Sequence, residues 1–188
     1  KTMTINMGPQ HPATHGVLRV ILEIDGETVV RCQPEVGYLH TGIEKTAEAK
    51  LYYKALPMTD RMDYLAPMSN NLGYCLGVEK LLGVEIPPKA QWARVLLTEI
   101  TRINSHLVWL GTHALDIGAL SMVLYAFRER EDVLTIYEAV SGQRMMSTYF
   151  RIGGLAEELP ENFDQLVRVL IKNMTVRLQE YEDILTNN

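Results

Sequence analysis

The hydrophobic period of this chain changes once, near Gly42, and that change most constrains its fold. Before it, apolar and polar residues alternate, as around Ile5 and Met7, which is the period of a half-buried strand. After it, apolar residues recur at steps of three and four, the period of an amphipathic helix. The sequence therefore predicts an α+β chain, with an N-terminal antiparallel β-sheet in residues 1–41 and a predominantly α-helical bundle in residues 42–188.

Turn and cap residues divide these regions into elements. Asp25-Gly26 lies between two strand-like runs and is typical of a hairpin, since both residues tolerate a positive φ. Prolines favour the first turn of a helix, and glycines favour its C-terminal cap. The expected helices are 44–54, one beginning between Thr59 and Pro67 and ending at Gly83, 88–111, 119–141, and one following Pro160.

A loop over residues 8–16, with two prolines and two glycines, separates the first two strands and contains His11 and His15. Prolines and glycines prevent a helix here, so the i, i+4 spacing of the histidines does not form a helical metal pair. A loop histidine that faces a cleft can donate a proton near neutral pH. The alternative is that either histidine only satisfies backbone groups in a rigid turn.

Two further places combine charged and apolar residues. Residues 59–64 contain Arg61 and Tyr64, and form either a capped helix start with a local ion pair or a functional site. Asp116 stands among apolar residues. It is either buried and paired with a histidine, an arginine or backbone donors, or exposed in a turn beside Gly118.

The segment 143–154 places Arg144, Met146 and a second arginine among sulfur and aromatic side chains. It is either a functional site or the C-terminal end of a helix, where arginines complement the helix dipole and glycines form the cap.

Composition excludes several classes of protein. The 18 Lys and Arg against 23 Asp and Glu give a net charge of −5, which argues against nucleic-acid binding. No run approaches the roughly 18 apolar residues of a membrane span.

The two cysteines, Cys32 and Cys75, do not form a C-x-x-C pair. An iron–sulfur or zinc site within this chain alone is therefore improbable, and both thiols are expected to be inert and partly buried. A chain that starts at Lys1 rather than Met is expected to be incomplete.

Five motifs occur in a fixed order along nearly the whole chain. They are GPQHPATHGVLR at 8–19, GYLHTGIEK at 37–45, RMDY at 61–64, YAFRERE at 125–131 and FRIGG at 150–154. Together they resemble the 49-kilodalton, or D, subunit of respiratory complex I, the proton-translocating NADH:quinone oxidoreductase. The resemblance covers about the N-terminal half of such a subunit, so the helical bundle is expected to continue beyond residue 188.

The resemblance implies a quinone-headgroup site. In this family, the residues matching His15 and Tyr64 hydrogen-bond the quinone, and the acid matching Asp116 pairs with that histidine. A quinone becomes a quinol with two electrons and two protons, and a His–Asp pair plus a phenol can supply protons. The electrons would come from the terminal [4Fe–4S] cluster, which cysteines of a neighbouring subunit hold.

The resemblance also places Arg61, Arg144 and Met146 around that neighbouring cluster. A positive charge at Arg61 would favour the reduced cluster. Many members have a histidine where this chain has Met146, and some have an arginine where it has Thr41, so the pH dependence of the cluster potential is expected to be weaker.

The family is also similar to the large subunits of nickel–iron hydrogenases, in which paired cysteines grip nickel. Two of those thiol positions correspond to Asp63 and Ala66 here, so we expect no metal bound by this chain. A related membrane-bound hydrogenase subunit, or another quinone or phenazine reductase, remains an alternative. A scaffold subunit without chemistry of its own is a third hypothesis.

The resemblance implies partners and a location. The expected partners are the terminal-cluster subunit, the C or 30-kilodalton subunit and the quinone-channel membrane subunit, with no nucleic acid. The expected location is peripheral, on the cytoplasmic side of a bacterial cell membrane, or on the matrix or stromal side of an organellar one. The isolated chain is expected to be inactive.

Overall fold

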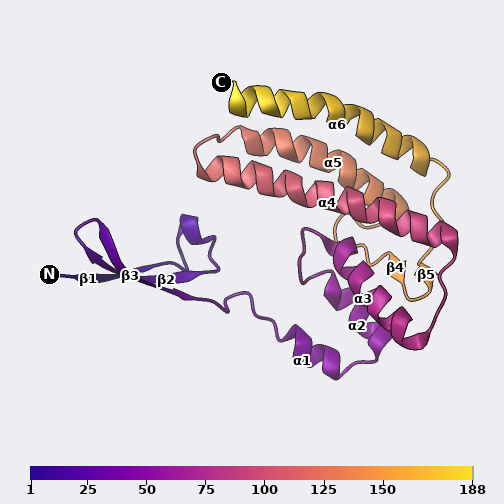
Figure 1. Cartoon of the computed structure of the whole chain (residues 1–188), viewed down its shortest axis with the longest axis horizontal. Helices are drawn as coiled ribbons and strands as arrows, with labels where there is room; N and C mark the ends of the chain where they lie inside the picture. The colour runs from indigo at the N-terminus through magenta and orange to yellow at the C-terminus, as the bar shows by residue number, and fades with distance from the viewer. Residues whose placement is uncertain (188) are drawn as a thin grey trace. The chain divides into compact units, whose positions relative to one another are not determined.

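The computed structural model describes residues 1–187 and has the predicted α+β architecture (Figure 1), with 57% helix and 13% strand. An N-terminal sheet is followed by mostly helical segments, as expected. Internal contacts divide the chain into a first unit, Lys1–Glu48, and a second that begins at Ala49. Each unit is described by itself below.

The first unit is built on a three-stranded antiparallel sheet in the order β1-β2-β3. Gly26 adopts a φ of 61° in the turn between β2 and β3, which confirms the predicted hairpin. Only Thr14 and Val20 are buried in this unit. Its elements are β1 (Met3–Met7), the 3-10 turn η1 (Pro12–Thr14), β2 (Arg19–Asp25), β3 (Thr28–Glu35) and α1 (Ile43–Glu48).

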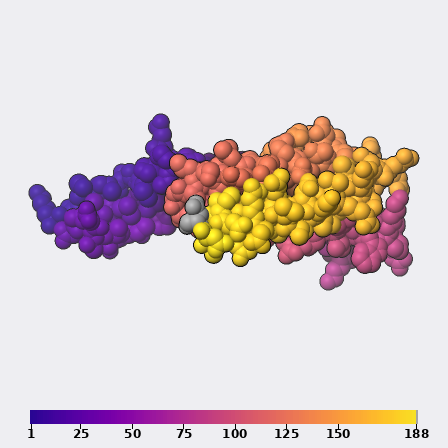
Figure 2. Space-filling model, turned by 90° about the horizontal axis from the view of Figure 1, so that it is seen from above, coloured from indigo at the N-terminus to yellow at the C-terminus, as the bar shows by residue number. Residues whose placement is uncertain are grey.

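The second unit contains three long helices, and α5 packs against both α4 and α6 (Figure 1). In the view of Figure 2, α6 runs in yellow along one face of this unit. The helix α3 and the small β4–β5 hairpin pack together beside α4. The elements are α2 (Tyr52–Thr59), α3 (Pro67–Leu82), α4 (Pro88–Asp116), α5 (Met122–Ser141), β4 (Phe150–Arg151), β5 (Gly154–Leu155) and α6 (Phe163–Thr186).

Cap residues set several of these boundaries as predicted. Pro67 and Pro88 occupy the first turns of α3 and α4. Gly83 and Gly142 end α3 and α5 in the left-handed conformation, with φ values of 66° and 71°. This conformation costs glycine little, because it has no Cβ.

Three predicted helix boundaries are wrong. The helix expected over 119–141 begins three residues later, at Met122. The helix expected over 44–54 is interrupted, because Leu51 is extended, with φ −64° and ψ 141°, and caps α2. The helix expected to end near Gly111 continues to Asp116. Gly111 serves helix packing instead: a Cβ there would lie 3.1 Å from Val123 Cα in α5.

The core of the second unit lies between its helices and includes Leu97, Val133, Tyr137 and Leu170, each almost fully buried. Trp92 lies in α4 but does not belong to this core, since its side chain is 76% exposed. Within residues 1–187, no helix has the length and apolar character that a membrane crossing requires.

Candidate functional site

The two histidines of the 8–16 loop have different roles in the fold. His11 precedes η1, and its Nδ1 accepts a hydrogen bond from the Ala13 N–H at 3.1 Å. His15 ends η1 in the left-handed conformation, with φ 52° and ψ 22°. Its imidazole is exposed and makes no hydrogen bond to other described residues. The turn-stabilising alternative therefore holds for His11 and leaves the His15 side chain available.

The loop that carries His15 has a tightly specified shape. The Thr14 hydroxyl is buried and lies 3.1 Å from Pro9 O and 3.0 Å from His11 O, to which it can donate. Gly8 has a φ of 86°, and a Cβ there would lie 2.2 Å from Leu18 O. No larger side chain fits at Gly8 without moving the backbone. The loop thus presents His15 from a defined backbone.

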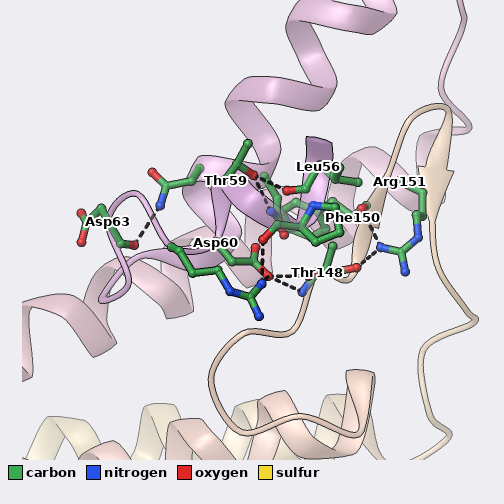
Figure 3. A network of polar contacts seen from close by, with 11 residues as sticks. Leu56, Thr59, Asp60, Asp63, Thr148, Phe150 and Arg151 are labelled. Atoms are coloured by element: carbon green, nitrogen blue, oxygen red, sulfur yellow. Dashed lines mark hydrogen bonds and ion pairs between the residues drawn. The ribbon is translucent and has the colours of Figure 1, made fainter. Parts of the chain in front are cut away.

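A second cluster lies where the turn after α2 meets the strand β4 (Figure 3). We call this the junction, formed by the turn 60–66 and the segment 146–151. Asp60 is fully buried in it. Its Oδ2 accepts the Thr148 N–H at 3.0 Å and also the Thr148 hydroxyl. Burial raises the pKa of Asp60, while the hydrogen bonds from Thr148, the nearby Asn71 amide and the charge of Arg61 oppose that rise.

The other polar groups of the turn are also largely satisfied within the fold. The Asn71 amide donates to Thr59 Oγ1 at 2.8 Å, and the Thr59 hydroxyl donates to Leu56 O at 2.8 Å. Asp63 Oδ1 accepts the Leu65 N–H at 3.2 Å. The two aspartates therefore hold the turn between α2 and α3. The predicted capped helix start is wrong, because α3 begins at Pro67 after Ala66 and has no side-chain cap.

Arg61 and Tyr64, by contrast, project polar groups from the turn. Arg61 Nη1 donates to Pro57 O at 2.6 Å and lies 3.8 Å from Asp60 Oδ2, and its side chain is 54% exposed. Tyr64 is 49% exposed. Its hydroxyl makes no hydrogen bond within residues 1–187, although a phenol against an apolar body usually has a polar partner.

Asp116 is the last residue of α4 and is exposed within residues 1–187, where it is not buried against a histidine or an arginine. Gly118 follows with a φ of 107°. A carboxylate in the last turn opposes the helix dipole, so helix stability does not explain it. In the described chain the carboxylate accepts no hydrogen bond. His15 belongs to the other unit.

Arg144 and Met146 lie in the segment between α5 and β4. Arg144 follows the Gly142 cap and forms ion pairs with Glu131 at 2.5 Å and Glu138 at 3.6 Å, both in α5. Arg144 therefore lies just beyond the end of α5, where the helix-end alternative expects it. Met146 is half-buried.

Residues 116–188 match the family described as "Respiratory-chain NADH dehydrogenase, 49 Kd subunit". The whole chain is 63% identical to a D subunit of the NADH-quinone oxidoreductase of Solibacter usitatus and 66% identical to one of Chloroflexus aurantiacus, covering 46% of each. Over 99% of its length it is 57% identical to the D subunit of Trichlorobacter lovleyi, covering 48%. The chain belongs to the complex I 49-kilodalton, or D, subunit family. It spans about half the length of these relatives.

Membership of the D-subunit family confirms the predicted resemblance. Within this D-subunit chain, the structure brings Arg61 and the segment containing Met146 to the two sides of the junction. His15 lies in the first unit, whereas Tyr64 and Asp116 lie in the second.

A buried ion pair in this D-subunit chain was not predicted from the sequence. Arg94 in α4 donates to Glu79 in α3 at 2.7 and 3.0 Å. It also donates to Arg151 O at 2.6 Å and Gly154 O at 2.9 Å, and the Gly153 N–H donates to Glu79 at 2.7 Å. The only sequence signal is an acid and an arginine on the apolar faces of two helices. The pair fixes the β4–β5 hairpin beside α3 and α4.

The two cysteines differ from the expectation that both are partly buried. Cys32 is exposed in β3, whereas Cys75 is buried, and burial raises the pKa of its thiol to about 11. A protonated thiol is a poor metal ligand. In residues 1–187, no three His, Cys, Asp or Glu side chains are grouped to hold a metal ion.

Proposed function

We propose that this chain forms the quinone-headgroup site of an NADH–quinone oxidoreductase, with His15, Tyr64 and Asp116 as the groups that serve the headgroup. One observation carries the proposal. These three side chains are exposed, and their polar atoms make no hydrogen bond in the described chain. The neighbouring His11 and Asp63 are both engaged by the backbone. The fold therefore leaves available the groups that the family resemblance assigns to quinone.

The chemistry of the three groups suits quinone reduction. A phenol and an imidazole can each donate a hydrogen bond to a quinone carbonyl oxygen, and each can pass a proton as the oxygens gain electrons. The Asp116 carboxylate can stabilise a protonated imidazole. A [4Fe–4S] cluster held by a neighbouring subunit would supply the electrons.

Arg61, Arg144 and Met146 are proposed to flank that neighbouring cluster, with unequal effects. The Arg144 charge is largely offset by Glu131 and Glu138. Arg61 has one carboxylate, at 3.8 Å, so it retains more positive potential to favour the reduced cluster. The thioether of Met146 adds no charge.

The assembled enzyme would couple this reduction to proton translocation. We propose contacts with the terminal-cluster subunit, the C or 30-kilodalton subunit and the quinone-channel membrane subunit, on the cytoplasmic side of a bacterial membrane. Apolar residues around the α4–α5 connection are suited to such contacts, since Ile117, Leu120 and Leu124 are 67–74% exposed. The chain alone would reduce no quinone.

The variant Tyr64→Phe in the assembled enzyme tests the proposal. Removing the hydroxyl is expected to lower kcat/KM for quinone by about 10²-fold, the lower end for a lost general acid. The matched control is Tyr53→Phe, since Tyr53 is 52% exposed and its hydroxyl makes no hydrogen bond within residues 1–187. NADH-driven reduction of the clusters should remain at the parental rate in both. Parental quinone kinetics in Tyr64→Phe would support a scaffold role instead.

A further inference from the structure

We propose that Asp60 is a positioning residue that clamps Thr148 (Figure 3) and thereby holds the Met146 segment against Arg61 across the junction. The functional part of this inference rests on the proposed quinone-reducing role. The clamp itself depends only on the geometry of the described residues.

The first step is the conformation of Thr148. Its φ is 39°, in the left-handed region, which is costly for a β-branched residue. Both Thr148 donors, the N–H and the hydroxyl, reach the same oxygen, Asp60 Oδ2. On the other side, Arg151 Nη1 donates to the Thr148 carbonyl oxygen. Thr148 is therefore held in an unfavourable conformation by side chains on both sides.

The second step is the rigidity of the surroundings. Tyr149 and Phe150 are buried at 1% and 0% exposure, so the chain after Thr148 is anchored in the core. Asp60 is also 0% exposed and ends α2. The clamp thus joins two fixed elements, and the φ of Thr148 sets the direction in which the chain extends back to Met146.

The third step links the clamp to Arg61. Asp60 Oδ2, which accepts both Thr148 donors, lies 3.8 Å from Arg61 Nη1. The other carboxylate oxygen, Oδ1, is buried and has no hydrogen-bond partner among residues 1–187. A buried carboxylate with one unpaired oxygen costs stability. The other oxygen, Oδ2, contacts both Thr148 and Arg61, so the Asp60 carboxylate is suited to position these two residues.

Tyr64 is held independently of this clamp. Asp63, its neighbour, accepts the Leu65 N–H and, through its carbonyl oxygen, the Asn70 amide at 2.8 Å. Loss of the clamp should therefore disturb the Arg61 and Met146 side of the site and leave Tyr64 in place. In kinetic terms, kcat should fall while KM for quinone is retained.

The test uses the variants Asp60→Asn and Thr148→Val in the assembled enzyme, with Thr148→Ser as the conservative variant. Asp132→Asn is the carboxylate control, because Asp132 is exposed in α5. Tyr137→Phe is the buried-hydroxyl control, because it removes a 2.6 Å bond to Thr101 away from the junction. Thr148→Val retains Asp60, so it tests the clamp even if Asp60→Asn does not assemble.

The first measurement is amide hydrogen exchange of peptides covering 146–151 in the purified enzyme. Exchange in Asp60→Asn is expected to be about tenfold faster, since a charge-assisted bond to the Thr148 N–H is weakened. Thr148→Val should show a smaller acceleration, and Thr148→Ser and both controls should match the parent. Parental exchange in Asp60→Asn and Thr148→Val would overturn the clamp.

The second measurement is quinone kinetics at matched amounts of assembled enzyme. Asp60→Asn is expected to lower kcat about tenfold, with KM within about twofold of the parent, as for a small misplacement near reacting groups. Faster exchange with parental kcat would overturn the positioning role. Parental quinone kinetics in Tyr64→Phe would contradict the proposed function instead, and the exchange measurement would still decide the clamp.

Discussion

At the residue scale, the loop histidines show what backbone conformation adds to a motif. The sequence presents His11 and His15 as equivalent candidates four residues apart. The structure separates them, because His11 caps η1 through its ring nitrogen while His15 ends η1 with φ 52°. A positive φ outside glycine is uncommon, and such residues concentrate at functional sites.

The left-handed conformation of His15 suggests a clean substitution. Asparagine tolerates a positive φ, so His15→Asn should keep the loop while it removes the imidazole. We expect parental amounts of assembled enzyme and a fall of about 10²-fold in kcat/KM for quinone. His40→Asn, at an exposed histidine of the same unit, is the control. Equal kinetics in the two variants would remove His15 from the site.

At the element scale, sequence periodicity predicted which segments form helices. It did not predict how these helices pack against one another. Proline and glycine caps are local signals. They placed the end of α3 at Gly83 and left its start open between Thr59 and Pro67, and the structure begins the helix at Pro67. The Arg94–Glu79 pair depends on the packing of α3 against α4, with partners 15 residues apart. Periodicity contains no such information. The role of Gly111 depends in the same way on the approach of α5.

Loss of the buried pair should destabilise the second unit strongly. Arg94→Ala leaves a buried carboxylate and two hairpin carbonyl groups without their donor, so we expect a loss of about 3–5 kcal/mol in the free energy of unfolding. Urea unfolding of the chain measures this. The control Arg168→Ala removes an exposed ion pair with Asp164 and should have little effect. Similar losses of unfolding free energy in the two variants would contradict a larger contribution from the buried ion pair.

The same pair predicts an acid-dependent stability. Burial alone would raise the pKa of Glu79, but hydrogen bonds from Arg94 and the Gly153 N–H and the Arg94 charge hold it below its ordinary 4.5. The ionised Glu79 carboxylate therefore makes its full contribution to the free energy of unfolding above pH 4.5. That contribution is lost as the pH falls through the lower pKa that Glu79 has in the folded chain. The stability difference between the parent and Glu79→Gln should shrink below pH 4.5. A difference that is constant with pH would contradict this assignment.

Replacing a helical glycine by alanine is expected to have opposite effects on the free energy of unfolding at two positions. A Cβ at Gly111 would lie 3.1 Å from Val123 Cα and 3.2 Å from Ala126 Cβ, so Gly111→Ala should cost about 1–2 kcal/mol of unfolding free energy. Gly73 in α3 has nothing within 4 Å of that position. Gly73→Ala should therefore stabilise by about 0.5–1 kcal/mol. Thermal or urea unfolding compares them, and equal signs would contradict the packing account.

At the scale of the whole molecule, the fold class was predictable because the hydrophobic period changes once. The exposed surfaces of the first unit were not predictable in this way. Thr14 and Val20 are the only buried residues in the first unit, and Val29 and Val30 of its sheet are more than half exposed. The chain covers 46–48% of the relatives compared above, and these surfaces are suited to contacts in a larger assembly. The proposed site residues likewise depend on groups from outside the described chain.

The central claim is that this chain binds the quinone headgroup, and photocrosslinking in the assembled enzyme tests it most directly. A short-chain quinone with a photoreactive group on its ring would be illuminated in membranes, and the labelled peptides sequenced. We expect label in peptides containing His15 and Tyr64, displaced by excess unmodified quinone and absent from peptides of α6. Quinone-displaceable label confined to other subunits would contradict the claim.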